Sequence, residues 1–278
     1  MKKTQVALAA LALMASTAAL ADVAMGGYVE AAVQNSSGSS RMIGGGLDIN
    51  KLYFSASEDA SDGWKAGAFA LIRFESTTGT LTRPGASTGQ NDGTFFEIAN
   101  VNLSNADFGT IEMGRTVDSY WGNGVAGFDV TGGSNLGSAV ASVLNLQASK
   151  IFIDNSVHYV SPNINGLTFA ATYAMMDSTS GSTIGLTKKE DQSYTANYNA
   201  GALSIGVGGM KSDLTRGHFL GIGYDLGVAK VNAVYQKVTD AKSFGVNTAI
   251  PLAGALSATA GYYKDTGTSF FVGEGKST

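Results

Sequence analysis

The chain contains no cysteine, and only 3 of its 278 residues are proline. Without cysteine no disulfide framework can stabilise the protein in an oxidising compartment, so hydrogen bonding and burial must do so. Charged residues make up 14% of the chain, against about 25% in soluble domains. The formal charge of −4 disfavours a nucleic-acid-binding protein, because such proteins carry a basic patch or stripe.

Long hydrophobic runs are almost absent as well. One apolar run extends from Val6 to Met14, after two lysines and before a stretch of small residues that ends at Ala21. A helix needs roughly 20 apolar residues to span a bilayer, so this run is too short for that role. The charged start, the short apolar run and the small residues are typical of a secretory signal peptide. A short buried helix is the alternative interpretation.

We therefore expect residues 1–21 to be a signal peptide, cleaved between Ala21 and Asp22, and residues 22–278 to form the mature domain. Loss of the two lysines would change the formal charge from −4 to −6. Secretion by this route places the mature protein beyond the inner membrane. No later segment is apolar enough to predict a membrane-spanning helix.

The sequence offers little for catalysis or metal binding. It has two histidines, His158 and His218, and no spacing typical of metal ligands or of a phosphate-binding loop, so no cofactor is expected. An outer-membrane enzyme would need a nucleophile, a base and a third group that orients the base. Ser156 and His158 share a strand face, but no third member accompanies them. We expect a protein that is not an enzyme.

The pattern that is present has a period of two. In GLTFAATYA, Leu167, Phe169 and Tyr173 fall on one face and two threonines on the other. Such alternation indicates strands with one face in an apolar environment. About thirteen segments of this kind, each near ten residues long, suit the tilted strands of a bilayer-spanning barrel. They are residues 23–34, 46–58, 64–75, 95–104, 109–116, 154–161, 167–176, 191–199, 202–210, 218–226, 229–238, 242–250 and 254–263.

The connections between these segments alternate in length. Short turns rich in Gly, Asn, Asp and Pro alternate with longer polar loops at residues 76–94, 117–153 and 177–190. Short turns at one end and long loops at the other are typical of an outer-membrane β-barrel. A secreted β-sandwich or adhesin-type binding protein, whose apolar face packs against a second sheet, would show the same alternation and is the alternative.

Three stretches resemble segments of one family. They are FSASEDASDGWKAG (54–67), VNLSNADFGTIEMGR (101–115) and DNSVHYVSPNINGLTFAATYA (154–174). Together they resemble the general diffusion porins of Gram-negative bacteria, of the proteobacterial trimeric type. The resemblance implies an all-β transmembrane antiparallel barrel of about 16 strands, a homotrimer in outer-membrane lipid, and a water-filled channel for passive diffusion of small hydrophilic solutes and ions. It also implies that residues 116–153 fold inward and constrict the channel.

Charged residues near the expected constriction are the candidate pore-lining residues. Strand parity places Arg73 and Glu75 on the polar face of one segment. The long loop supplies two acids, Asp118 and Asp129. Basic and acidic sides of a constriction would create a transverse field that favours small polar solutes over apolar ones. The residues expected to line the constriction are Arg41, Arg73, Glu75, Arg115, Asp118, Asp129 and His158.

The role of Arg115 is implied by the resemblance, since it stands where the family's G-R pair lies at the constriction. Strict alternation disagrees, because the parity of Arg115 matches Ile111 and Met113 rather than Glu112. We expect a twist or bulge at Gly114 to redirect the side chain. A surface arginine at the end of the strand is the alternative.

His158 stands where the family's hairpin motif usually has arginine. Because the ordinary pKa of histidine lies near 6.5, we expect anion preference to rise below about pH 6. A solvated histidine without effect on conduction is the alternative. A substrate-specific channel lined by aromatic residues is a further alternative, for which Tyr53 and Phe69 are the candidates.

The chain ends in SFFVGEGKST, residues 269–278. Porins of the family that it resembles typically end in a strand with a terminal aromatic residue, which pairs with the first strand. With about 13–14 strands here against about 16, roughly three strands are expected to be missing or incomplete. A truncated product or a fragment, which need not conduct, is favoured over a smaller barrel that closes by itself.

Overall fold

The computed structural model describes residues 22–36, 38–44, 50–79, 81, 95–130, 151–175, 191–211, 216–254 and 257–266. The expected signal peptide and the C-terminal stretch 267–278 lie outside the described residues. The described part of the chain is almost entirely β-structure, with short helical turns in two of the connections between strands.

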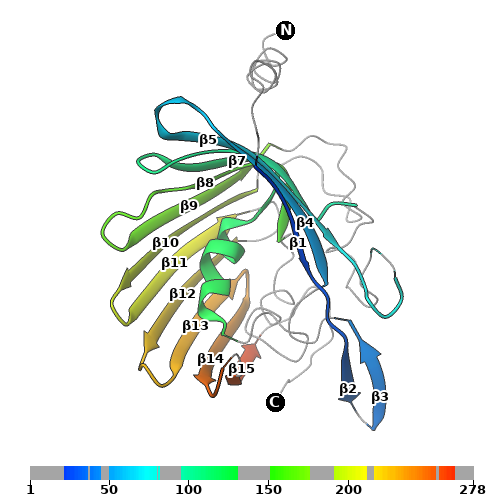
Figure 1. Cartoon of the computed structure of the whole chain (residues 1–278). Helices are drawn as coiled ribbons and strands as arrows, with labels where there is room; N and C mark the ends of the chain where they lie inside the picture. The colour runs from blue at the N-terminus through cyan, green and yellow to red at the C-terminus, as the bar shows by residue number, and fades with distance from the viewer. Residues whose placement is uncertain are drawn as a thin grey trace.

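Thirteen strands form one antiparallel sheet, and two more form a separate ribbon. Each strand of the large sheet pairs with its neighbours in chain order, with β1 and β15 at the two edges (Figure 1). Among the described residues no pairing joins β1 to β15. The large sheet contains β1 (Asp22–Tyr28), β4 (Lys51–Asp59), β5 (Trp64–Arg73), β6 (Ile98–Asn105), β7 (Gly109–Val117), β8 (Phe152–Val160), β9 (Leu167–Ala174), β10 (Gln192–Ala200), β11 (Leu203–Lys211), β12 (Arg216–Asp225), β13 (Lys230–Val238), β14 (Ala241–Pro251) and β15 (Ser257–Thr266).

The predicted strands agree with this sheet, because each of the thirteen predicted segments overlaps one of its strands. The prediction of one strand over residues 23–34 was wrong. The first strand ends at Tyr28, and a hairpin of β2 (Ala32–Ser36) and β3 (Ser39–Ile43) follows it. Gly38, with φ of 80°, adopts the left-handed conformation that the tight turn of this hairpin requires. Alternation alone does not reveal a turn inside a polar stretch.

The strands sort their side chains between a concave inner face and a convex outer face. On β12, Leu220, Ile222 and Tyr224 point outward and are 53%, 49% and 51% exposed, whereas Phe219 points inward and is buried. No second sheet covers this apolar outer face in the described part of the chain. An apolar outer face suits a bilayer, whereas the strands of a sandwich would bury it against another sheet.

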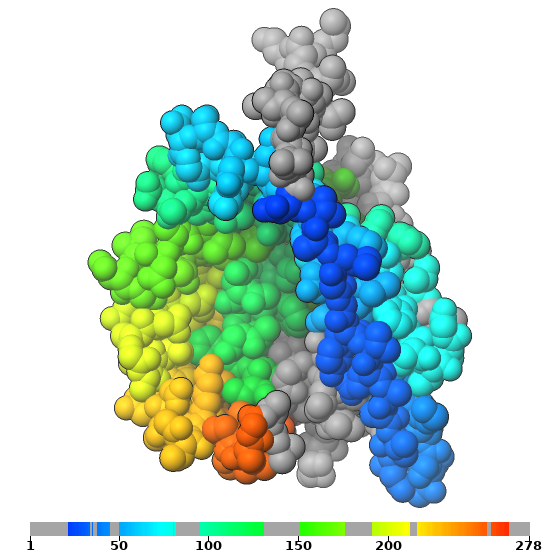
Figure 2. All heavy atoms as spheres, viewed as in Figure 1, coloured from blue at the N-terminus to red at the C-terminus, as the bar shows by residue number. Residues whose placement is uncertain are grey.

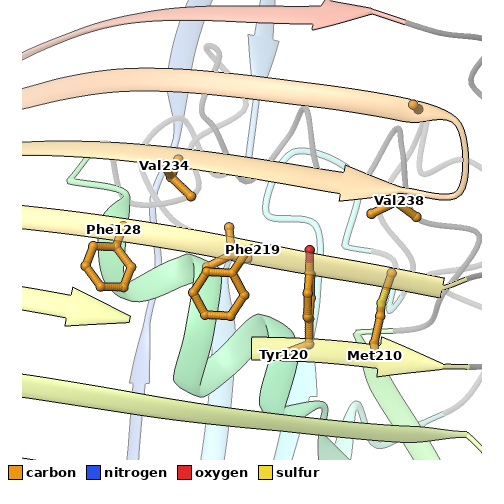
Figure 3. Packing of buried hydrophobic residues seen from close by; sticks show 8 residues of the cluster. Tyr120, Phe128, Met210, Phe219, Val234 and Val238 are labelled. Atoms are coloured by element: carbon orange, nitrogen blue, oxygen red, sulfur yellow. The ribbon is translucent and has the colours of Figure 1, made fainter. Parts of the chain in front are cut away.

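Residues 118–130, here named the inward segment, follow β7 and lie against the inner face of the sheet (Figures 1 and 2). They contain the helical turns η2 (Tyr120–Gly124) and η3 (Val125–Phe128). These turns contact β10 to β13. The main buried apolar cluster therefore lies between the inward segment and the wall, and it consists of Tyr120, Val125, Phe128, Met210, Phe219, Val234, Val238 and Ala241 (Figure 3).

Two facing glycines make room for the inward segment. Gly206 on β11 is directly opposite Gly221 on β12, and both belong to the inner face. A Cβ atom at either position would lie 2.4 Å from an atom of the Phe128 ring, which no real contact allows. The Phe128 ring therefore fills a hollow that exists only because both residues lack a side chain.

Candidate channel constriction

Hydrogen bonds anchor the start of the inward segment to the wall. The backbone N–H and the hydroxyl of Ser119 lie 2.9 and 2.7 Å from the Thr172 hydroxyl on β9. Ser193 on β10 donates to the carboxylate of Asp118, which is 5% exposed. Burial raises the pKa of Asp118 to about 6; the nearby Asp191 carboxylate adds to the increase and the Ser193 hydrogen bond opposes it.

His158 connects two parts of the wall with the inward segment. Its Nδ1 lies 3.2 Å from the Glu112 carboxylate on β7, and its Nε2 lies 3.0 Å from the side-chain oxygen of Asn123. Both facing atoms are acceptors, so only the doubly protonated ring can donate to both of them. The histidine is buried on the inner face, whereas Tyr159 beside it points outward and is 40% exposed.

Arg73 and Arg115 lie close together through Glu97, which sequence reasoning missed. Arg73 forms a two-pronged ion pair with the Glu97 carboxylate, at 2.7 and 2.9 Å. Arg115 Nε donates to the backbone carbonyl of Glu97 at 3.0 Å, and its guanidinium pairs with Asp154. Glu97 lies just before β6, where a residue's face cannot be assigned from alternation.

A β-bulge at this point explains the pairing of Arg115. Gly114 is opposite Ser156, but Thr116 is opposite Ile153, so two residues of β8 face Arg115 alone. Gly114 has a φ of 138°. A β-bulge is thus present at the expected position, with its extra residue on β8, whereas the redirection of the Arg115 side chain toward the channel stays a prediction. On the β6 side of β7, Arg115 still pairs with Ala99, so the pairing of β7 with β6 is regular at this point. The bulge therefore accommodates Asp154 beside the guanidinium.

Two other predicted residues have different surroundings. Glu75 is buried directly after β5 and accepts hydrogen bonds from the backbone N–H and hydroxyl of Thr77, at 3.1 and 2.8 Å. Arg41 is exposed on β3, in the separate ribbon (Figure 1). The structure thus brings Arg73 and Arg115 together and keeps Arg41 off the large sheet.

Asn247 on β14 holds the end of the inward segment. Its side-chain N–H donates to the carbonyl of Phe128 at 2.9 Å, and its side-chain oxygen accepts from the N–H of Val130 at 3.1 Å. Asn247 is 1% exposed, and Asn232 lies beside it at 3.4 Å. The two bonds fix the backbone on both sides of Asp129, whose side chain remains partly exposed.

The arrangement of Ser156 and His158 does not support a catalytic pair. The Ser156 hydroxyl contacts the carbonyls of Gly114 and Ile153, at 3.1 and 2.8 Å, and both ring nitrogens of His158 have other partners. Within the described residues no group of three or more His, Asp or Glu side chains could hold a metal ion. Tyr53 and Phe69 stack on the inner face with ring centroids 5.9 Å apart.

Buried polar atoms without a protein partner gather on the inner face. Among the residues with such atoms are Thr195, Asn232 and Gln236 on the strands and Trp121 of the inward segment. Buried polar groups almost always have a hydrogen-bond partner, and water is the usual partner where the protein supplies none. The interior of the curved sheet is therefore suited to water.

Among the described residues, none of the helices has the length and apolar composition that a membrane crossing requires.

A single antiparallel sheet with an apolar outer face, curved around a segment from its longest connection, defines the class of outer-membrane β-barrel channels. A family model described as Gram-negative porin matches residues 7–278. The chain therefore belongs to the Gram-negative porin family, whose members are channels of the outer membrane. No curated protein matches the chain.

Solved porin structures share the fold. An anion-selective porin from Comamonas acidovorans is 20% identical, with a TM-score of 0.66 over 87% of this chain and 78% of that chain. A loop-deletion mutant of OmpT, an outer membrane protein of Vibrio cholerae, is 13% identical, with a TM-score of 0.64 over 88% and 82%. A mutant of the Rh. blastica porin is 11% identical, with a TM-score of 0.52 over 87% and 94%.

Proposed function

We propose that the inward segment forms the constriction of this porin and sets the size of the solutes that pass. The observation that carries the proposal is the fit of Phe128 into the hollow at Gly206 and Gly221, together with the two hydrogen bonds of Asn247. Contacts at both ends hold the segment inside the channel rather than outside it. The width of the remaining opening then decides which hydrophilic solutes diffuse through.

The charges at this constriction create a field across the opening. Asp118 and Asp129 belong to the inward segment. Arg73 and Arg115, each of which is paired with an acidic residue, belong to the wall. His158 belongs to the wall as well and lies between Glu112 on β7 and Asn123 of the inward segment. Arg41 and Glu75 complete the set of residues that we assign to the pore.

Lower pH makes this constriction more positive. As the pH falls through about 6, Asp118 loses its negative charge, because burial has raised its pKa to that value. Anion preference is therefore expected to increase as the solution becomes acidic.

The mature chain is proposed to start at Asp22, after cleavage of the signal peptide at Ala21, and to assemble as a homotrimer in outer-membrane lipid. The resemblance of three sequence stretches to trimeric porins supports this assembly. Small hydrophilic solutes and ions are the proposed permeants, with no cofactor, no nucleic acid and no catalytic step.

Planar-bilayer recording tests the proposal. Residues 22–278 are refolded in detergent, and single insertion events are recorded in a neutral bilayer. Stepwise closure in groups of three would support both the channel and the trimer. Single closures would contradict the trimer alone. A Phe128→Ala variant with unchanged conductance would contradict the constriction alone, and the complete absence of conductance would contradict the channel.

A further inference from the structure

The outer face carries an asymmetric row of cations at one end of its strands. At this end of the sheet β11 and β13 finish and β12 and β14 begin. The long connections lie on the same side, which faces the cell exterior in outer-membrane barrels. The outward residues at this end are basic, and all except the half-buried Lys237 are exposed. We name them the basic band: Lys211, Arg216, His218, Lys237 and Lys242.

The members of the basic band face each other directly across the strands. Lys211 is opposite Arg216, His218 is opposite Lys237, and Lys237 is also opposite Lys242. Neighbouring strands lie about 4.8 Å apart, and like charges directly opposite destabilise a sheet. Repulsion of this kind is relieved when an anion binds between the cations.

Acidic side chains do not neutralise the band within the part of the chain that the structure describes. Asp240 belongs to the turn between β13 and β14, and Asp265 points to the inner face because it pairs with buried Ser243. The opposite end of the same outer face differs, since there the outward residues Tyr224 and Val231 are directly opposite each other and carry no charge. The excess of positive charge is thus confined to the loop end.

An apolar row directly adjoins the basic band. Leu220, Tyr235 and Phe244 lie two residues along the strands from His218, Lys237 and Lys242, and Val207 is directly opposite Leu220. These four apolar residues, Val207, Leu220, Tyr235 and Phe244, are 45%, 53%, 36% and 44% exposed. Two residues of a strand span about 6.6 Å. A ligand that fits both rows has an anionic head and, within that distance, an apolar tail.

We propose that the basic band binds the phosphate-bearing headgroups of anionic lipids in the leaflet at the loop end, while the adjoining apolar row contacts their acyl chains. Basic residues next to an apolar membrane surface attract anionic lipids at short range. The proposal uses the outer face only, so it does not depend on the constriction.

Binding of a fluorescent phosphatidylglycerol to the refolded protein in neutral detergent tests this proposal. The test variant is Lys237→Gln with Lys242→Gln, and the control is Lys230→Gln, an exposed lysine at the turn end of β13 in the row of the inner face. We expect the double variant to bind on the order of tenfold more weakly and the control to bind like the wild type. Phosphatidylcholine should bind weakly to all three proteins. Equal binding of the two lipids by the wild type would overturn the proposal.

Two further measurements distinguish a bound lipid from a free anion and from a second copy of the chain. Inorganic phosphate should not displace the lipid; displacement at equal phosphate concentration would mean that the band binds the free anion instead. The thermal midpoint of the double variant without lipid should equal or exceed that of the wild type, because repulsion is removed. A lower midpoint together with loss of oligomers would assign the band to contact between copies of the chain and overturn the proposal.

Discussion

The carboxamide of Asn247 controls one charged residue of the constriction, because it bonds to the backbone on both sides of Asp129. In Asn247→Ala the carbonyl of Phe128 and the N–H of Val130 lose their partner, at a cost of about 1–3 kcal/mol for each group that stays buried. We expect the end of the inward segment to loosen and Asp129 to shift. Reversal potentials in a KCl gradient should therefore differ from those of the wild type.

Two companion variants make this test specific. Asn247→Asp keeps the acceptor for Val130 but loses the donor to Phe128, so its effect should be intermediate at a pH where the new acid is ionised. Asn232→Ala removes a neighbour of Asn247 that, among the described residues, forms no hydrogen bond with the inward segment, and its effect should be small. Identical selectivity in all three variants would mean that Asn247 does not position Asp129.

The buried carboxyl group of Asp118 should make the ion selectivity depend on pH, and the direction of the change follows from the pKa of this group. Burial raises this pKa from 3.8 to about 6, so the carboxyl is mostly ionised at pH 7 and mostly neutral at pH 5. Loss of a negative charge at the constriction should increase the ratio of anion to cation permeability between these two values. Reversal potentials recorded across the range measure the ratio.

The Asp118→Asn variant isolates this contribution. At pH 7 this variant should already show the ratio of anion to cation permeability that the wild type shows at pH 5. The ratio should also change less with pH than in the wild type. His158→Gln removes the second candidate group, and the turn residue Asp107→Asn provides a control outside the constriction. A profile that stays unchanged in Asp118→Asn and flattens only in His158→Gln would assign the whole effect to the histidine.

At the scale of elements, the contact between η3 and the glycines of β11 and β12 holds the inward segment in place. Gly221→Val would place a side chain where the Phe128 ring lies, and overpacking of this kind costs about 1–3 kcal/mol. Valine itself suits a strand, so the wall should fold. We expect the ring to be displaced and single-channel conductance to change, with larger solutes admitted in liposome-swelling assays.

A double-mutant cycle tests whether the effect passes through this contact. With Phe128→Ala present, Gly221→Val should have much less additional effect, because the clash is gone. Leu220→Ala, the outward-pointing neighbour, should leave conductance unchanged. Additive effects of the two inner substitutions would show that the glycine acts independently of the ring.

The elements also show what the sequence could and could not predict. Alternation correctly located thirteen strands, because each has one apolar face. The long connection after β7 was expected to fold inward, but its partners lie about 35 to 120 positions further along the chain, as with Asn123 and His158 or Phe128 and Asn247, and no local pattern encodes such contacts. The pairing of Arg115 with Asp154 depends on a bulge, which breaks the alternation used to assign faces.

At the scale of the whole molecule, the choice between barrel and sandwich depended on more than periodicity. Both folds alternate in the same way, and only loop lengths and family resemblance favoured the barrel in the sequence. The structure adds the physical reason: the apolar cluster lies between the inward segment and the inner face, while apolar side chains such as Leu220 and Phe244 stay exposed on the outer face. Such a surface is stable in lipid and a liability in water.

A charge scan along the outer face of β12 tests this orientation directly. Leu220 lies near the middle of the strand, so Leu220→Lys should destabilise the protein by about 2–4 kcal/mol in bilayers, as expected for a cation at the midplane. Tyr224→Lys, near the turn end, should cost only about 0–1 kcal/mol, since a lysine there reaches the interface. Denaturant unfolding in lipid vesicles measures both costs. Equal small costs at the two positions would mean that this face does not contact the hydrocarbon core.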